Sequence, residues 1–192
     1  MTPRHAGGSE AVMERVTLIG YRGCGKSTVA ALLAARTGLP WVDADAELEQ
    51  RLGCSIAELI RSRGEEVFRD EESRVLADLL EGQSCILATG GGVVLRPGNR
   101  DLLRRLGRPV VWLTAPAAVV RQRLAADPST ASRRPGLAGG DPLAEVADAL
   151  AVRDPLYRGC ADVVFDASSD AAAEVAARIH EWRSGWSAES RS

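Results

Sequence analysis

Short apolar runs alternate with longer amphipathic stretches along most of the chain. The apolar runs predict buried strands at Val16–Ile19, Trp41–Asp43, Cys85–Thr89, Val110–Thr114 and Val163–Asp166. The amphipathic stretches predict helices that begin at Ser27, Ala46, Ser55, Glu65, Pro97, Pro116, Pro142 and Asp170. Because strands that alternate with helices pair in parallel, the pattern predicts an α/β protein with helices on both faces of a sheet. Ligands of such sheets lie at the carboxyl ends of the strands.

Two helix boundaries carry signals of their own. Ser55 followed by Glu58 forms a capping box, in which the two residues satisfy each other's backbone N–H groups at a helix start. Pro155 predicts an interruption of the helix that follows Pro142, because proline lacks a backbone donor and disfavours helical geometry in the preceding residue. On these local grounds Arg153 is a cation near a helix end.

The segment from Gly20 to Ser27 follows the first predicted strand and fits G-x-x-x-x-G-K-[ST], the pattern of a phosphate-binding loop (P-loop). Its Lys26 is the only lysine among 24 lysine and arginine residues. Glycines let the backbone aim N–H groups at phosphate oxygens, and a hydroxyl is a hard ligand for Mg²⁺. A glycine-rich turn that merely caps a helix is the alternative, but the flanking strand and helix favour nucleotide binding. The predicted nucleotide-binding residues are Gly23, Cys24, Gly25, Lys26, Ser27 and Thr28, with Ser27 also a metal ligand.

Length and composition limit the remaining possibilities. With 192 residues, 45% of them hydrophobic, the chain is predicted to form one domain (15–184) between a disordered leader (1–14) and a tail (185–192). The net charge of −2 and the lack of a long apolar run predict no nucleic-acid partner and no membrane partner. Four widely spaced cysteines predict reduced thiols in the cytoplasm. We expect a monomer, because no heptad pattern is present.

Two carboxylates stand at the end of the second predicted strand. Asp43 and Asp45 are two residues apart, so on extended backbone they project from one face. Beside a P-loop, one carboxylate suits Mg²⁺ and the other suits the hydroxyl of a phosphoryl acceptor. The alternative is that Asp45 caps the following helix while Asp43 is solvated. The P-loop upstream favours the catalytic interpretation.

One segment breaks the alternating pattern. Residues 127–140 are rich in Pro, Gly, Ser and Ala, and they include the adjacent arginines Arg133 and Arg134. The segment is either a solvated linker or a mobile lid, at about 127–141, that brings an arginine onto bound phosphate. The P-loop favours the lid.

Three further features have both a structural and a functional interpretation. Arg69 lies on a charged helix, where Glu72 is placed to pair with it. The three glycines Gly90, Gly91 and Gly92 follow the third strand, where they form either a plain loop or a close approach of backbone to ligand. Arg153 is either the helix-end cation already described or a ligand-binding group.

Together these pieces resemble the shikimate kinase family. The residues that carry the resemblance are Gly25-Lys26-Ser27-Thr28, Val42-Asp43-Ala44-Asp45, Phe68-Arg69, Gly90-Gly91-Gly92, Arg134-Pro135 and Arg153-Asp154-Pro155-Leu156-Tyr157. They occur in the family's order from about Val16 to Arg183. The resemblance implies a P-loop kinase fold, three layers with a five-stranded parallel sheet and a lid. It also implies transfer of the ATP γ-phosphate to the 3-hydroxyl of shikimate.

The resemblance also implies roles for individual residues. Lys26 and Ser27 would bind phosphates and Mg²⁺, and Asp43 would hold the Mg²⁺ through water. Asp45 would meet the acceptor hydroxyl, and Arg134 would come from the lid onto the nucleotide, with Arg133 as the alternative for this phosphate contact. The shikimate carboxylate would bind Arg69 and Arg153, and its pocket would be lined by the backbone of Gly90, Gly91 and Gly92. Paired guanidinium forks suit a carboxylate because they bind it bidentately.

One departure from the family pattern leaves alternatives open. The family lid usually reads Arg-Pro-Leu-Leu, whereas this chain has Gly136 after Arg134-Pro135. Gly136 removes an apolar side chain near the acceptor. A related kinase that acts on gluconate or an aminated shikimate analogue is therefore a second hypothesis. A nucleotide-dependent switch without transfer activity is a third.

Overall fold

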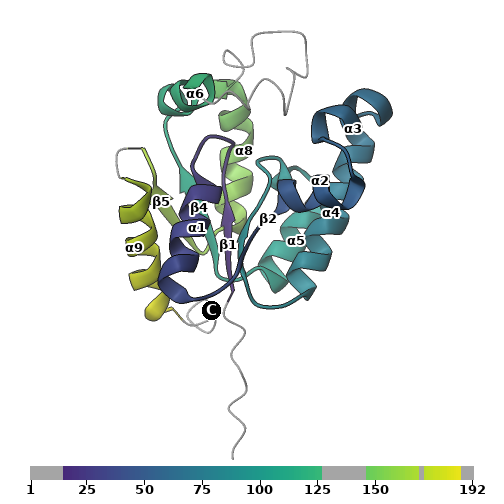
Figure 1. Ribbon diagram of the computed structural model, residues 1–192. Helices are drawn as coiled ribbons and strands as arrows, with labels where there is room; N and C mark the ends of the chain where they lie inside the picture. The colour runs from purple at the N-terminus through teal and green to yellow at the C-terminus, as the bar shows by residue number, and fades with distance from the viewer. Residues whose placement is uncertain (1–14, 127–145, 169–170, 187–192) are drawn as a thin grey trace, which may run out of the picture.

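Five parallel strands form a single sheet at the centre of the computed structural model, which describes residues 15–126, 146–168 and 171–186 (Figure 1). The strands lie in the order β2-β3-β1-β4-β5. Their bounds are Val16–Ile19 (β1), Trp41–Asp43 (β2), Ile86–Ala88 (β3), Val110–Thr114 (β4) and Val163–Asp166 (β5). Four of the five match the predicted ranges, and β3 is one residue shorter at each end. The predicted parallel sheet is confirmed.

Helices cover both faces of the sheet, which gives the three predicted layers (Figure 1). One face packs against α1 and α9, and the other packs against α4, α5 and α8. The helices are α1 (Lys26–Thr37), α2 (Ala44–Leu52), α3 (Ile56–Arg63), α4 (Glu65–Glu81), α5 (Pro97–Leu106), α6 (Ala117–Ala126), α8 (Val146–Cys160) and α9 (Ala172–Ser184), with a short 3₁₀ helix η1 (Val93–Leu95). The starts of α1 to α6 lie within two residues of the predicted ones.

Side-chain alternation along the central strands divides the core in two. In β4, Val111 and Leu113 face the α1 and α9 layer, whereas Val110 and Trp112 face the α5 and α8 layer. All four are buried, because a parallel sheet with helices on both faces has no exposed side. This burial explains why the strand appears in the sequence as a continuous apolar run.

A third apolar cluster joins α2, α3 and α4 beside the sheet. Its members are Leu48, Ile56, Leu59, Phe68 and Val75. The helix α3 begins with the predicted capping box: the backbone N–H of Glu58 donates to the Ser55 hydroxyl, and the Ser55 N–H donates to the Glu58 carboxylate. The three helices form an arm beside the sheet, and their apolar cluster holds α4, the helix that carries Arg69.

The predicted interruption at Pro155 is wrong, because α8 continues through it to Cys160. Pro155 and Ala151, whose carbonyl loses its helical donor, both lie on the exposed side of the helix. The opposite side is anchored by the buried residues Val146, Tyr157 and Cys160. Packing therefore outweighs the local effect of one proline, and Arg153 lies in mid-helix rather than at a helix end.

Several predictions fall outside the described residues. These are the leader 1–14, the lid at 127–141 with Arg133, Arg134 and Gly136, the helix start at Pro142, and the last part of the tail. Within the described part of the tail, the ring of Trp186 lies 6.2 Å from that of Trp182, which packs against the core. No helix in the described residues is both long enough and apolar enough to cross a bilayer.

Candidate active site

The P-loop joins the end of β1 to the start of α1 (Figure 1). A Cβ on Gly20, which has a positive φ of 140°, would overlap the carbonyl oxygen of Leu113, so only glycine fits this turn. Lys26 is buried, and its Nζ donates to the backbone oxygens of Gly20 (2.8 Å) and Tyr21 (3.0 Å). The ammonium is therefore held within the loop, at the positive end of α1. Ser27 and Thr28 in the next positions are exposed.

A pocket of about 240 Å³ lies beside the P-loop on the α9 side. Its lining includes the P-loop residues Cys24, Gly25 and Thr28, together with Arg123 from α6. The Arg123 guanidinium donates to the backbone oxygens of Ala167 (2.6 Å) and Gly23 (3.4 Å), so it bridges the P-loop and the segment after β5. No motif in the sequence marks Arg123, and only the fold brings it from α6 to the P-loop.

Burial decides the chemistry of the Cys24 thiol. The side chain is almost fully buried, and this burial raises the pKa of its thiol despite the nearby Lys26 ammonium. Cys24 thus behaves as a small apolar residue of the loop rather than as a thiolate. All four cysteines of the chain are free thiols, as expected.

Asp43 and Asp45 do not project from one strand face, so that expectation is wrong. β2 ends at Asp43, and Asp45 already belongs to the first turn of α2. The capping role also falls to Asp43 rather than Asp45, because the Asp43 Oδ1 accepts from the N–H groups of Asp45 (3.0 Å) and Ala46 (3.2 Å). The second Asp43 oxygen, Oδ2, accepts a hydrogen bond from the Ser27 hydroxyl. The cap therefore holds one oxygen of Asp43 and leaves the other facing the P-loop.

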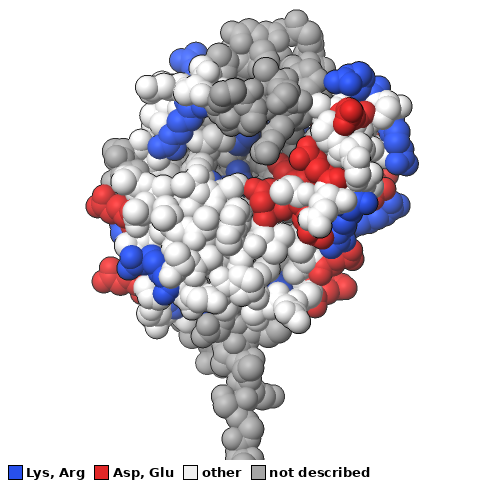
Figure 2. Space-filling model, viewed as in Figure 1, with Lys and Arg blue, Asp and Glu red and all other residues white. Residues whose placement is uncertain are grey.

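Asp45 lies instead against the glycine loop, which is the buried segment Gly90-Gly91-Gly92 after β3. A Cβ on Gly90 would be 2.6 Å from Asp45 Oδ1 and 2.7 Å from Glu72 Oε1. Only hydrogen at this position lets the two carboxylates approach the backbone so closely. Acidic side chains gather over the region of α2 in the space-filling view (Figure 2).

Arg69 approaches the glycine loop from α4. A Cβ on Gly92 would lie 2.7 Å from its guanidinium carbon, so the guanidinium fills the space that a side chain would need. Nη1 of Arg69 pairs with Glu72 (2.8 Å) and Nη2 pairs with Glu65 (2.9 Å). Burial lowers the pKa of Arg69, but the two carboxylates more than offset this and leave the pKa above its ordinary value. The charge on the guanidinium is thus maintained in a buried place.

Arg153 and Tyr157 approach the same loop from α8. Both donate to the carbonyl oxygen of Gly91, Arg153 through Nη1 (3.3 Å) and Tyr157 through its hydroxyl. Burial raises the pKa of Tyr157, which keeps the hydroxyl protonated as a donor. A Cβ on Gly91 would be 2.9 Å from the backbone nitrogen of Arg22, so this glycine also packs directly against the P-loop.

The structure therefore brings most of the predicted site residues to one place. Lys26, Asp45, Arg69 and Arg153 come from α1, α2, α4 and α8, and the glycine loop lies among them. Asp43 and Ser27 meet at one side of the P-loop. Arg134, the remaining predicted residue, lies outside the described residues. This end of the sheet is where the carboxyl ends of the parallel strands meet.

The sheet order, the P-loop after β1 and the helical arm define a P-loop kinase fold. The shikimate kinase family model matches residues 22–183. The chain belongs to the shikimate kinase family.

Individual relatives support this assignment. A shikimate kinase of Oleidesulfovibrio alaskensis is 46% identical over 84% of this chain and 92% of its own length. One of Halorhodospira halophila is 44% identical over 87% of this chain and 92% of its own length. Among solved structures, the shikimate kinase of Acinetobacter baumannii in complex with shikimate superposes with a TM-score of 0.82 at 34% identity, over 89% of this chain and 93% of that one. The predicted family and the predicted three-layer P-loop kinase fold are confirmed, whereas the lid at 127–141 stays a prediction.

Proposed function

We propose that this protein transfers the γ-phosphate of ATP to the 3-hydroxyl of shikimate, giving shikimate 3-phosphate and ADP. One observation carries the proposal: two buried or half-buried guanidinium groups, Arg69 and Arg153, and the carboxylate of Asp45 converge on a single loop that packs against the P-loop. Such a site suits a small acceptor that has both a carboxylate and a hydroxyl group. The solved relative with shikimate bound supports this choice of acceptor.

The nucleotide is assigned to the P-loop and to the pocket beside it. Phosphate oxygens accept from the backbone N–H groups at the start of α1, and the helix dipole favours their negative charge. The nucleoside part fits the pocket of about 240 Å³ next to Cys24, Thr28 and Arg123. The ammonium of Lys26 donates to two neutral backbone carbonyl oxygens. When phosphate binds, anionic phosphate oxygens replace these carbonyl acceptors and form stronger hydrogen bonds with the ammonium.

Ser27 and Asp43 are suited to hold Mg²⁺. Both supply hard oxygen ligands, and their contact places the two oxygens together at the edge of the P-loop. The described residues contain no group of three or more His, Cys, Asp or Glu side chains that could hold a metal ion by themselves, so we assign the remaining ligands to nucleotide phosphates and water. When bound, Mg²⁺ neutralises phosphate charge and helps to align the γ-phosphate.

At the acceptor end, we assign the shikimate carboxylate to Arg69 and Arg153. Gly90, Gly91 and Gly92 line the ring with backbone. Asp45 orients the 3-hydroxyl and accepts its proton as the phosphoryl group moves. Positioning and charge neutralisation carry most of the rate in such a reaction, so a preformed set of charged groups is the main requirement. Arg134 in a lid at 127–141 completes the proposal as the group that neutralises charge on the transferred phosphoryl.

An ADP-release assay tests the function directly. Purified protein with ATP and Mg²⁺ is supplied with shikimate, an aminated shikimate analogue, gluconate or no acceptor. We expect turnover with shikimate, none for Lys26→Met, and formation of a phosphate ester that mass spectrometry detects. Preference for gluconate or the aminated analogue would replace the proposed acceptor. Rapid ADP release without any acceptor would support a nucleotide-dependent switch instead.

We also propose that the protein acts as a monomer in the cytoplasm. The four free thiols are what a reducing compartment maintains, and every proposed binding group comes from the same chain. Light scattering of the purified protein during turnover tests the monomer.

A further inference from the structure

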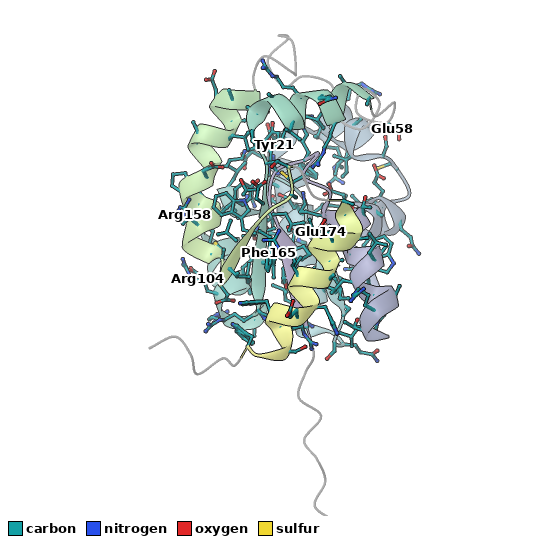
Figure 3. The ribbon with its side chains drawn as sticks, turned by 90° about the vertical axis from the view of Figure 1, so that its left-hand side faces the viewer. Tyr21, Glu58, Arg104, Arg158, Phe165 and Glu174 are labelled. Atoms are coloured by element: carbon teal, nitrogen blue, oxygen red, sulfur yellow. The ribbon has the colours of Figure 1, made fainter. Side chains whose placement is uncertain are left out.

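Tyr21 stands between the two halves of the site, although no role follows from its place in the P-loop motif. Its side chain is buried, with only 4% of its surface exposed. Its backbone oxygen accepts from Lys26 Nζ (3.0 Å), and the Arg153 guanidinium carbon lies 5.1 Å from the centre of its ring. Figure 3 shows Tyr21 at the upper end of the sheet, near α8.

The contact between the Tyr21 ring and the Arg153 guanidinium is a cation–π contact, which can hold a guanidinium in place. The face of an aromatic ring carries partial negative charge and attracts a cation that lies over it within about 6 Å. Within the described residues Arg153 also donates from Nη1 to the carbonyl oxygen of Gly91 (3.3 Å) and interacts with the side chain of Tyr157. A guanidinium has five N–H donors, so the Tyr21 ring, the Gly91 carbonyl and Tyr157 can hold Arg153 while further donors serve a carboxylate.

The surroundings make Tyr21 a rigid support. Gly91 packs against the Tyr21-Arg22 peptide, where a Cβ would be 2.9 Å from the Arg22 nitrogen and 3.5 Å from the Tyr21 carbonyl carbon. Tyr157 also holds Gly91, because its hydroxyl donates to the Gly91 carbonyl oxygen. The ring that contacts Arg153 therefore belongs to the loop that binds phosphate, and its position is fixed by the glycine loop.

We propose that Tyr21 is a positioning residue for Arg153, so that the nucleotide loop itself orients the group that binds the acceptor carboxylate. The inference rests on the proposed function, because it concerns acceptor affinity. The ring acts through the electrostatics of its face. A substitution that weakens the face without changing its shape is therefore expected to weaken acceptor binding and leave nucleotide binding unchanged.

The experiment replaces Tyr21 by phenylalanine and by 3,4,5-trifluorophenylalanine, which has a similar shape but an electron-poor face. Shikimate affinity is measured by titration calorimetry, and KM values for shikimate and ATP by ADP release. We expect Tyr21→Phe to match the wild type and the trifluoro variant to raise the shikimate KM about 5- to 30-fold, the range for a cation–π contact of 1–2 kcal/mol. The ATP KM is expected to stay unchanged.

A double-mutant cycle identifies the partner. In an Arg153→Ala background the trifluoro substitution is expected to have no further effect on shikimate affinity. Additive effects would transfer the role to Arg22, whose guanidinium carbon lies 5.8 Å from the same ring, and would overturn the inference. Arg158→Ala removes another arginine–ring contact of α8, with Trp112, and serves as the control with unchanged affinity.

The outcomes separate this inference from the proposed function. If the wild type fails to phosphorylate shikimate, the proposed function is lost whatever Tyr21 does. If the wild type is active and the trifluoro variant keeps the wild-type shikimate KM, the ring only fills space and the positioning role is wrong.

Discussion

The guanidinium of Arg69 occupies the space that a side chain on residue 92 would need. Because Gly92 has no Cβ, the arginine of α4 reaches the glycine loop and still keeps its ion pairs with Glu72 and Glu65. Glycine is therefore required in this loop because neighbouring groups occupy the space of a side chain. Its three positions are each approached by a different set of groups: Asp45 and Glu72, the P-loop backbone, and Arg69.

Gly92→Ala tests this relationship. The new methyl group would displace the Arg69 guanidinium, so we expect the shikimate KM to rise at least 10-fold, about 1.4 kcal/mol, with the ATP KM unchanged. Steady-state ADP release measures both constants. Gly98→Ala on α5 is the matched control, because a Cβ there would meet nothing within 4 Å. An unchanged shikimate KM in Gly92→Ala would remove Arg69 from the acceptor site.

Asp43→Asn separates metal binding from helix capping. Asparagine keeps an oxygen that accepts from the N–H groups of Asp45 and Ala46, so α2 retains its cap. The variant loses the negative charge beside Ser27, and we expect the Mg²⁺ concentration for half-maximal activity to rise about 10-fold or more. A Mg²⁺ titration of ADP release measures the shift, and thermal unfolding checks the fold. The same half-maximal concentration in variant and wild type would contradict a metal role.

A pair of threonines tests the cost of a buried hydroxyl. The Thr17 hydroxyl is buried without a hydrogen-bond partner among the described residues, whereas the Thr89 hydroxyl donates to the backbone oxygen of Leu18 (3.0 Å). We expect Thr17→Val to raise the free energy of unfolding by about 1 kcal/mol and Thr89→Val to lower it by about 1 kcal/mol. Urea unfolding measures both. Equal changes of the same sign in the two variants would defeat the argument.

Thiol reactivity reports the burial of Cys24. Because burial raises the pKa of this thiol, less thiolate is present at a given pH, and alkylation requires a higher pH. Cys54 is partly exposed, whereas Cys24, Cys85 and Cys160 are buried. With iodoacetamide at about pH 8, we expect peptide mass spectrometry to find Cys54 modified first and the others only after unfolding. Modification of Cys24 as fast as Cys54 would show an open, activated loop.

The fold was largely predictable because its signals are local. Four strand ranges and the capping box of Ser55 follow from apolar runs and from one pair of residues. The P-loop was equally clear, because its glycines and Lys26 are adjacent in sequence. The interruption predicted at Pro155 is wrong because the local preference of proline is outweighed by the packing of the buried side of α8.

The sequence alone determined the parallel sheet, the phosphate-binding loop and the identity of the charged groups, since these depend on periodicity and on neighbouring residues. Tertiary structure decided which of those groups meet. It placed Asp43 as the cap of α2 with one oxygen on Ser27, brought Arg123 to the pocket, and set Tyr21 under Arg153. These contacts join residues that are far apart in the chain. Their separation in space is fixed only when helices pack on both faces of the sheet.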